Sequence, residues 1–238
     1  MKILFCLLLG FSVLQAQVKE VKIGTQVWMV ENLKVFYFTN GDAIPIVKSD
    51  KEWLKACENK QPACCYYENN AEYGKTYGVL YNSYAIIDKR GLAPVGYHIP
   101  TDEEWKILAD YLGGIEVAGT KMKSTSGWNS YNGELKCNVC KSWSPEQKAG
   151  QTCTTCNDTR KTKARIPGNG TNESGFNGLP GGARSGVFYH VGDYGYWWGF
   201  SLFYRDSGIL RMLKYDDGSF ERTILLGCKG IYVRCLRD

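Results

Sequence analysis

The segment from Gly91 to Gly114, GLAPVGYHIPTDEEWKILADYLGG, constrains the fold of this chain more than any other part of the sequence. Thr101 followed three residues later by Glu104 forms a capping box, and Pro100 keeps the preceding backbone extended. The pattern therefore predicts a helix that begins at Asp102 and ends at a pair of glycines. Its buried face is formed by apolar residues at helical spacing, namely Trp105, Leu108, Ala109 and Leu112.

Further signals predict one more helix and several short strands. A second capping box, Ser49 with Glu52, predicts a short helix from Asp50 to about Glu58. Alternation of apolar and polar residues about Gly24-Thr25 predicts an early antiparallel hairpin over residues 21–33. A glycine-rich stretch, 167–186, predicts long loops. The last part of the chain predicts three short strands and one turn, at residues 196–203, 209–215 and 231–236, with the turn at Asp216–Ser219.

The N-terminus has the pattern of a secretory signal peptide. Lys2 precedes an apolar run from Ile3 to Leu14, and the small residue Ala16 suits cleavage before Gln17. The run is too short to cross a bilayer of about 30 Å as a helix. We therefore expect residues 1–16 to be removed and residues 17–238 to form one domain without a transmembrane segment, secreted or held outside the cytoplasm at the periplasm or cell surface.

Charge is concentrated in one part of the chain. The formal net charge is +5, of which Lys2 supplies one. Residues 134–165 hold seven basic and three acidic side chains, so the rest of the mature domain is close to neutral. A nucleic-acid-binding surface needs basic residues spread along a groove or face, and we expect no nucleic-acid partner.

Motifs spread along the mature chain form one consistent pattern beside the helix start at Pro100–Trp105. They are Gly24–Leu33 (GTQVWMVENL), Cys65–Tyr67, Tyr77–Asn82 (YGVLYN), Ser174–Phe176, Leu179–Gly182, Tyr196–Trp198 and Ile231–Cys235 (IYVRC). This pattern resembles the Fibrobacter succinogenes major paralogous domain family. The resemblance implies an α+β, C-type-lectin-like or formylglycine-generating-enzyme-like fold with short antiparallel strands, two helices, long loops and a cysteine-rich insertion. It carries no general biochemical role.

The insertion, residues 134–166, contains the sharpest chemical signal. Cys137 and Cys140 form one CxxC pair, and Cys153 and Cys156 form another. Two such tight turns facing each other can supply four thiolates to one structural zinc ion, whose charge nearby lysines and arginines would balance. Two disulfides are the alternative that export favours, and a redox dithiol is a third.

The five other mature cysteines are Cys57, Cys64, Cys65, Cys228 and Cys235. Spacing alone cannot fix their pairing. The family resemblance places Cys65 and Cys235 at recurring landmarks and so implies that they form a disulfide. Cys57 with Cys64 is the second choice, which leaves Cys228 as a free thiol.

Catalytic patterns are weak in this sequence. Its two histidines, His98 and His190, have no nucleophile placed beside them by a motif. We find no counterpart of the copper-binding cysteine segment of formylglycine-generating enzymes in the C-terminal half. The calcium-binding triplets of sugar-binding C-type lectins, Glu-Pro-Asn, Gln-Pro-Asp and Trp-Asn-Asp, do not occur.

These observations favour a non-catalytic binding module for an extracellular protein or glycan. Arginine and aromatic residues dominate binding energy at interfaces, and glycine-flanked loops can expose them. We therefore expect Arg184, Tyr189 and Tyr194 to line the recognition face. The alternatives are an oxidase related to the formylglycine-generating group and a structural module of the cell envelope.

Overall fold

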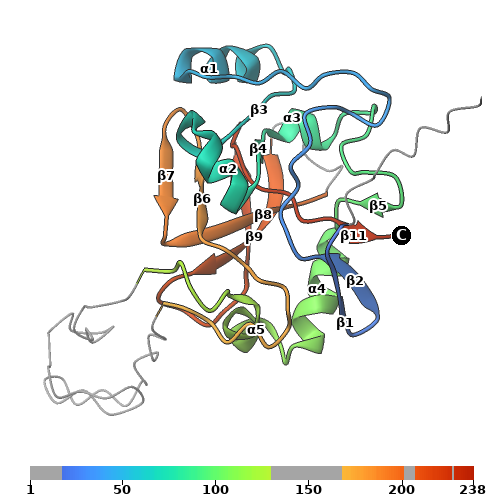
Figure 1. Cartoon of the computed structure of the whole chain (residues 1–238), viewed down its shortest axis with the longest axis vertical. Helices are drawn as coiled ribbons and strands as arrows, with labels where there is room; N and C mark the ends of the chain where they lie inside the picture. Colours follow the sequence, from blue (N-terminus) through green and yellow to red (C-terminus); the bar gives the residue numbers. More distant parts are fainter. Residues whose placement is uncertain (1–17, 130–167, 201–206, 227) are drawn as a thin grey trace, which may run out of the picture.

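The chain folds into a mixture of short helices and small antiparallel sheets. The computed structural model describes residues 18–129, 168–200, 207–226 and 228–238 (Figure 1). Its helices are α1 (Asp50–Glu58), η1 (Tyr67–Asn69), α2 (Ala71–Tyr77), α3 (Ser83–Ile86), α4 (Asp102–Tyr111) and α5 (Ile115–Met122). Its strands are β1 (Glu20–Ile23), β2 (Gln26–Met29), β3 (Cys64–Cys65), β4 (Leu80–Tyr81), β5 (Tyr97–His98), β6 (Gly181–Arg184), β7 (Phe188–Val191), β8 (Tyr194–Gly199), β9 (Ser207–Lys214), β10 (Glu221–Leu226) and β11 (Leu236–Arg237).

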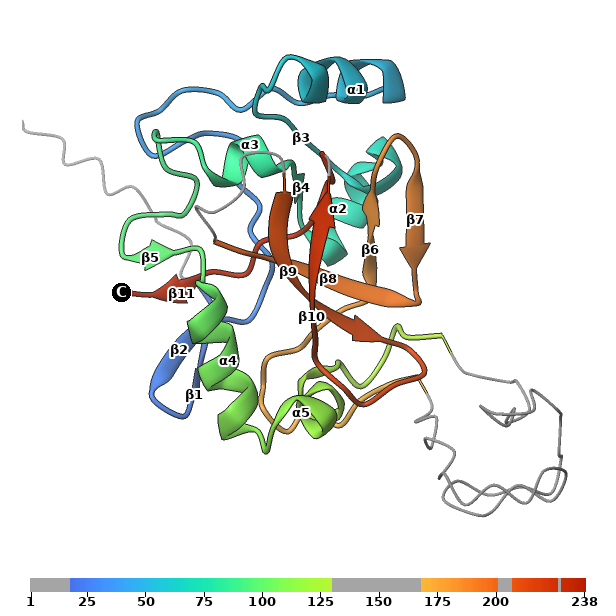
Figure 2. The ribbon, with the colours of Figure 1, turned by 180° about the vertical axis from the view of Figure 1, so that it is seen from behind.

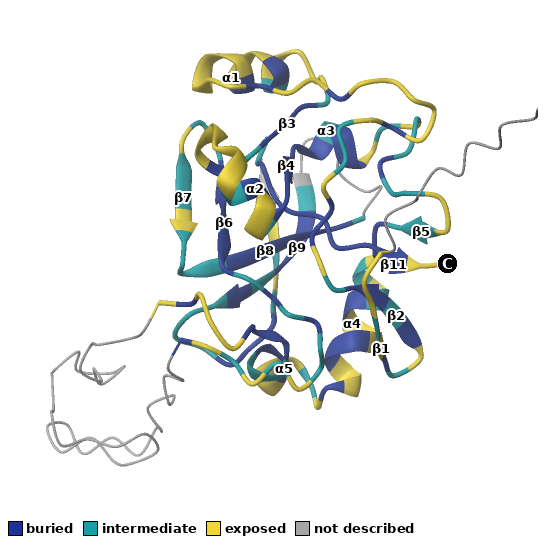
Figure 3. Cartoon of the chain, in the orientation of Figure 1, coloured by how far each residue is buried: buried dark blue, intermediate teal, exposed yellow. Residues whose placement is uncertain are grey.

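Both helices predicted from capping boxes are present. Ser49 and Glu52 cap α1 reciprocally, and Thr101 and Glu104 do the same for α4. The predicted apolar face of α4 is buried in the core, as Figure 3 shows. The two starts are therefore determined locally, because each capping box satisfies backbone donors that no helical carbonyl can reach.

The expected number of helices was wrong, because α2, α3 and α5 are also helical in the described residues. These three are short and carry residues of low helix propensity, such as Gly74 in α2 and Gly119 in α5. Gly119 lies against the turn between β9 and β10, where an added Cβ would overlap the backbone carbonyl of Ser219. Tertiary packing, rather than local propensity, therefore stabilises these helices.

Two sheets organise the described residues. One has the strand order β1-β2-β11-β5, so the early hairpin pairs with the last strand of the chain. That hairpin is confirmed, with Ile23 opposite Gln26 across the Gly24-Thr25 turn. The other sheet has the order β10-β9-β8, and its β9–β10 connection contains the predicted turn. Figure 2 shows this sheet from behind, crossing the middle of the molecule.

Strand β8 divides the core into two clusters. Trp197 packs in one cluster with Trp28, Trp105 and Phe176, whereas Tyr196 and Trp198 pack in the other. Neighbouring side chains of a strand point to opposite faces, so both faces of β8 must be covered. Tyr196, Trp197 and Trp198 are accordingly all buried, although they point to both faces of the strand.

A fully buried arginine links three of the sequence motifs. Arg234 donates to the Asn32 side-chain oxygen from Nε at 3.0 Å and from Nη2 at 2.8 Å, and to the Met29 carbonyl at 3.2 Å. The same Asn32 oxygen accepts the Trp197 indole N–H at 2.8 Å. Burial lowers the pKa of Arg234 to about 9. Asn32 thus ties the end of the hairpin to β8 and to the last motif.

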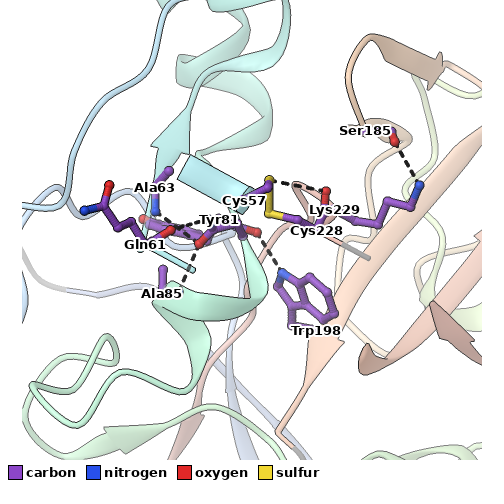
Figure 4. Close-up of a disulfide and its surroundings, with 10 residues drawn as sticks. Cys57, Gln61, Ala63, Tyr81, Ala85, Ser185, Trp198, Cys228 and Lys229 are labelled. Carbon is purple, nitrogen blue, oxygen red and sulfur yellow. Dashed lines mark hydrogen bonds between the residues drawn. A yellow bond between two sulfur atoms is a disulfide. The ribbon is translucent and has the colours of Figure 1, made fainter. Parts of the chain in front are cut away.

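The disulfide pairing predicted from the family landmarks was wrong. Cys57 of α1 is bonded to Cys228 (Figure 4). Cys64, Cys65 and Cys235 are buried free thiols. Cys64 and Cys65 are neighbours on β3 and therefore point to opposite faces. Cys65 lies in the cluster that contains Trp197, whereas Cys235 lies in the other cluster. The core itself separates the two thiols that we had expected to pair.

Candidate functional site

Two of the three predicted recognition residues lie together on one partly exposed surface. Tyr189 comes from β7 and Tyr194 from β8, and both are half-buried. They lie beside the exposed His190 and above Tyr196. We call this surface the aromatic face and define it by Tyr189, His190, Tyr194, Tyr196, Met212 and Lys214.

Alternation along β8 and β9 builds the aromatic face. Tyr194 and Tyr196 are two residues apart, so they share one face of the strand, and their rings are parallel at 5.5 Å. Lys214 lies directly opposite Tyr194 across the β8–β9 pair, and Met212 lies opposite Tyr196. The register of the β8–β9 pair therefore places the two tyrosines of β8 beside the lysine and the methionine of β9, on one face of the sheet.

His190 lies at the centre of the aromatic face. Its ring is 4.4 Å from that of Tyr194, and Nδ1 lies 2.8 Å from the Tyr196 hydroxyl. The residue has a φ of 65°, a conformation that costs a non-glycine residue about 1 kcal/mol or more. The β7–β8 turn maintains it, because the Asp193 N–H donates to the His190 carbonyl at 3.1 Å. The strained backbone therefore lies at His190, the residue whose imidazole is exposed to solvent.

Two tyrosines of the aromatic face, Tyr189 and Tyr196, keep their phenols in one protonation state. Burial raises the pKa of Tyr189 above the ordinary tyrosine value, and raises that of Tyr196 well above it. Both phenols therefore stay neutral at physiological pH. Lys214 at the rim forms an ion pair with Glu221 at 2.7 Å, and this partner raises its pKa although partial burial opposes the rise. The face combines neutral aromatic area with a paired charge at its edge.

Arg184 does not belong to the aromatic face, so its predicted exposure was wrong. Its side chain is fully buried on β6, where Nη2 donates to Asp50 at 2.8 Å. The guanidinium also lies 4.9 Å from the Trp53 ring and 4.5 Å from the Phe188 ring. Arg184 therefore anchors α1 to the β6–β7 hairpin. The flanking glycines misled the prediction because they belong to a packed strand rather than to an exposed loop.

His98, on β5 of the four-stranded sheet, bridges two carboxylates. Nδ1 lies 2.7 Å from Asp238 Oδ1, and Nε2 lies 2.9 Å from Glu104 Oε1. Carboxylates accept hydrogen bonds, so only the protonated imidazole can donate to both. Partial burial opposes protonation, but the bonds to Asp238 and Glu104 outweigh it and raise the pKa of His98. Sequence reasoning missed this bridge because its members are brought together by β5, α4 and the end of the chain.

A buried ammonium occupies the turn between β9 and β10. Lys123 Nζ donates to the backbone carbonyls of Lys214 and Asp217, each at 3.1 Å. Burial lowers its pKa to about 8, against the opposing charges of Asp217 and Asp216. The carbonyl oxygens of this acidic turn are thus already bound to a cation that the chain itself supplies.

The predicted zinc ligands, Cys137, Cys140, Cys153 and Cys156, lie outside the described residues. Within the part of the chain that the structure describes, no group of three or more histidine, cysteine, aspartate or glutamate residues is arranged to hold a metal. The free thiols there are shielded: burial raises the pKa of Cys64 and of Cys235 to about 12. Burial also raises the pKa of Cys65, although Arg184 partly offsets it.

Comparison with known proteins identifies the family. The mixed architecture and the Asn32–Arg234 core define a helix-and-sheet domain that runs from the first hairpin to the last strand. The model of the Fibrobacter succinogenes major domain matches residues 21–237, so the chain belongs to this family. No curated protein matches, and no solved structure matches. Among the described helices, none has both the length and the apolar character needed to cross a membrane.

Proposed function

We propose that this protein is an extracytoplasmic, non-catalytic binding module that holds a protein or glycan on its aromatic face. The observation that carries the proposal is the stack of the exposed His190, the half-buried Tyr194 and the buried Tyr196, with strained backbone at His190. Aromatic side chains provide much contact area at low entropic cost, and they are enriched among residues that dominate binding energy.

The proposal includes two further expectations from the sequence. The first is export by a signal peptide over residues 1–16, which agrees with the Cys57–Cys228 disulfide because such bonds persist in oxidising compartments. The second is a C-type-lectin-like or formylglycine-generating-enzyme-like arrangement, which the family motifs support.

The oxidase alternative is less well supported by the described residues. A copper-dependent oxidase that binds its metal through cysteines needs accessible soft ligands with thiolate character. Cys64, Cys65 and Cys235 are buried thiols with raised pKa values. Retention of stoichiometric copper by the purified protein would favour the oxidase instead.

The experiment is a binding screen followed by matched substitutions. The full chain is screened against a glycan array and against isolated cell-envelope proteins, and the strongest ligand is then titrated against Tyr194→Ala and His190→Ala. We expect each change to weaken affinity about tenfold, the loss of about 1.4 kcal/mol typical of an interface anchor. Tyr37→Ala is the control, because Tyr37 is an exposed tyrosine outside the aromatic face.

Two results would contradict this proposal. Unchanged affinity in both aromatic-face variants, with normal melting temperatures, would place the ligand elsewhere. Absence of any ligand, together with stable incorporation of the protein into the envelope, would favour the structural-module alternative.

A further inference from the structure

A second surface, distant from the aromatic face, forms a hollow beside the His98 bridge. The pocket has a volume of about 520 Å³ and lies against the loop 91–96, drawn in green between α3 and β5 in Figure 1. It reaches Phe200 at the end of β8, whereas the aromatic face begins at Tyr194, at the start of the same strand. Phe200 follows β8 and lies four residues beyond Tyr196, the last aromatic-face residue on that strand, so the two surfaces are about 13 Å apart along the strand direction.

The lining of this pocket is apolar with an acidic margin. Its apolar part comes from Ile86, Leu92, Pro94, Ile99 and Phe200. Among the described lining residues, the carboxylates and basic groups are Asp88, His98 and Asp238, with no lysine or arginine, and the Tyr97 phenol is neutral because its pKa is raised. Volumes of this size are typical of sites for small organic molecules.

The charges behind the lining leave the His98 side of the pocket negative. On one side, Arg90 pairs with both Asp88 and Asp42, which leaves one negative charge in excess. On the other side, His98 pairs with both Asp238 and Glu104, which leaves at least one negative charge even when the imidazole is protonated. Lys89 is exposed and does not line the pocket, but its charge acts on Asp88 and offsets that excess, so the remaining negative charge lies beside His98.

Asp238 has capacity for another donor. Its side chain is 59% exposed, and only Oδ1 is bound to His98. A carboxylate has two oxygens with about four lone-pair sites, so Oδ2 can accept from a ligand without breaking the bridge. Partial exposure weakens such an ion pair by solvent screening, whereas the apolar floor adds hydrophobic stabilisation.

We propose that this pocket binds an organic ammonium ion, whose apolar body lies on Leu92, Ile99 and Phe200 while its charged head contacts Asp238. Charge complementarity excludes an anion of the same shape, because no cationic side chain among the described lining residues can receive it. This ligand is independent of the partner assigned to the aromatic face.

The test compares three probes of one shape. Hexylammonium, hexanol and hexanoate are titrated into the isotope-labelled full chain, and backbone amide signals of Gly91, Val95 and Gly96 are followed by NMR. Hexylammonium should produce saturable shifts, with a dissociation constant in the range of about 1 mM expected for a small ligand of this kind. Hexanol should bind more weakly, and hexanoate most weakly.

Substitutions separate the charge from the fold. Asp238→Asn should weaken hexylammonium binding about fivefold, as expected for a partly screened ion pair, whereas Asp238→Glu should retain it. Asp110→Asn is the matched control, since Asp110 is an exposed carboxylate paired with Lys106 on α4. Tyr194→Ala should leave the affinity unchanged.

The outcomes are decisive in either direction. The proposal is overturned if hexylammonium gives no saturable shifts, if hexanoate binds as tightly, or if Asp238→Asn keeps full affinity while melting normally. Loss of protein or glycan binding in Tyr194→Ala without loss of hexylammonium binding would confirm that the two sites are separate.

Discussion

Asn32 shows how a single residue can hold distant motifs together. Its side-chain oxygen accepts from Arg234 and Trp197, and its amide donates to the Tyr77 carbonyl at 2.8 Å. Among the described residues, no ion pair supplies a carboxylate to the Arg234 guanidinium. Its charge is instead stabilised by oxygen dipoles and by the Phe176 ring at 4.4 Å. Asn32, Trp197 and Arg234, each from a different family motif, thus make core contacts with one another.

Replacing Asn32 should therefore destabilise the fold strongly. Asn32→Ala leaves a buried arginine and a buried indole without their shared acceptor, and such losses cost about 3–5 kcal/mol. Urea denaturation measures this change in the free energy of unfolding. Glu31→Ala next to it is the control and should cost less than about 1 kcal/mol, because Glu31 is exposed and its pairs with Lys19 and Lys34 are screened. Equal losses in the two variants would contradict the role of Asn32.

His98 predicts a pH-dependent contribution to stability. Its folded-state pKa is raised above the unfolded value of about 6.5, so the stabilisation is fully present below that pH and is lost as pH rises through the folded-state pKa. His98→Gln should consequently be more damaging at pH 5.5 than at pH 8.5. We expect the difference in unfolding free energy to be below about 1 kcal/mol, because the side chain is 36% exposed and screened. Thermal or urea unfolding at both pH values checks the sign, and an equal effect at both would contradict it.

At the scale of secondary structure, the disulfide joins elements that few other contacts unite. Cys57 lies on α1, and Cys228 lies beyond β10, 171 residues later in the chain. Figure 4 shows the bond near Lys229, whose Nζ donates to Ser185 at 2.8 Å. Together with the Arg184–Asp50 pair, this contact network attaches the outer helix to the strand layer.

Removing the disulfide should lower stability substantially. Replacing Cys57 and Cys228 together with serine releases a long loop, for which the chain-entropy model gives up to about 5 kcal/mol, although measured values are often smaller. Urea denaturation of the unaltered protein and of the double variant measures the loss in the free energy of unfolding. A reducing agent should not destabilise the core of the double variant further. Peptide mapping without reduction provides a separate check, and a Cys65–Cys235 peptide would contradict the pairing.

At the scale of the whole molecule, the two chain segments that flank the cysteine-rich insertion contact each other where they join the core. We call this junction the base of the insertion. The chain leaves at Asn129 and returns at Gly168, where an added Cβ would meet the Asn129 carbonyl at 2.5 Å. The Trp128 N–H donates to the Asn169 side chain at 3.1 Å. Asn129 N–H also donates to Gly192 at 2.8 Å, so the base lies beside the turn that presents the aromatic face.

We propose that the insertion holds one zinc ion through Cys137, Cys140, Cys153 and Cys156. Elemental analysis of protein purified without added metal should find about one zinc per chain, as a closed four-thiolate site requires. Cys140→Ser should remove the metal and leave the melting temperature of the core almost unchanged, because the base is closed independently. Zinc well below one equivalent with no free thiols at these positions would instead show two disulfides.

Sequence patterns alone determined the elements whose signals are local. The capping boxes of α1 and α4, the apolar face of α4 and the Gly24-Thr25 hairpin each depend on residues within one or two turns of chain, so their physics can be read from spacing. The family also followed from motif order. Only the tertiary structure decided which cysteines pair, that Arg184 is buried, and that His98 meets Asp238. Those outcomes depend on which face of a strand meets which neighbour, and that is settled by packing between segments far apart in the chain.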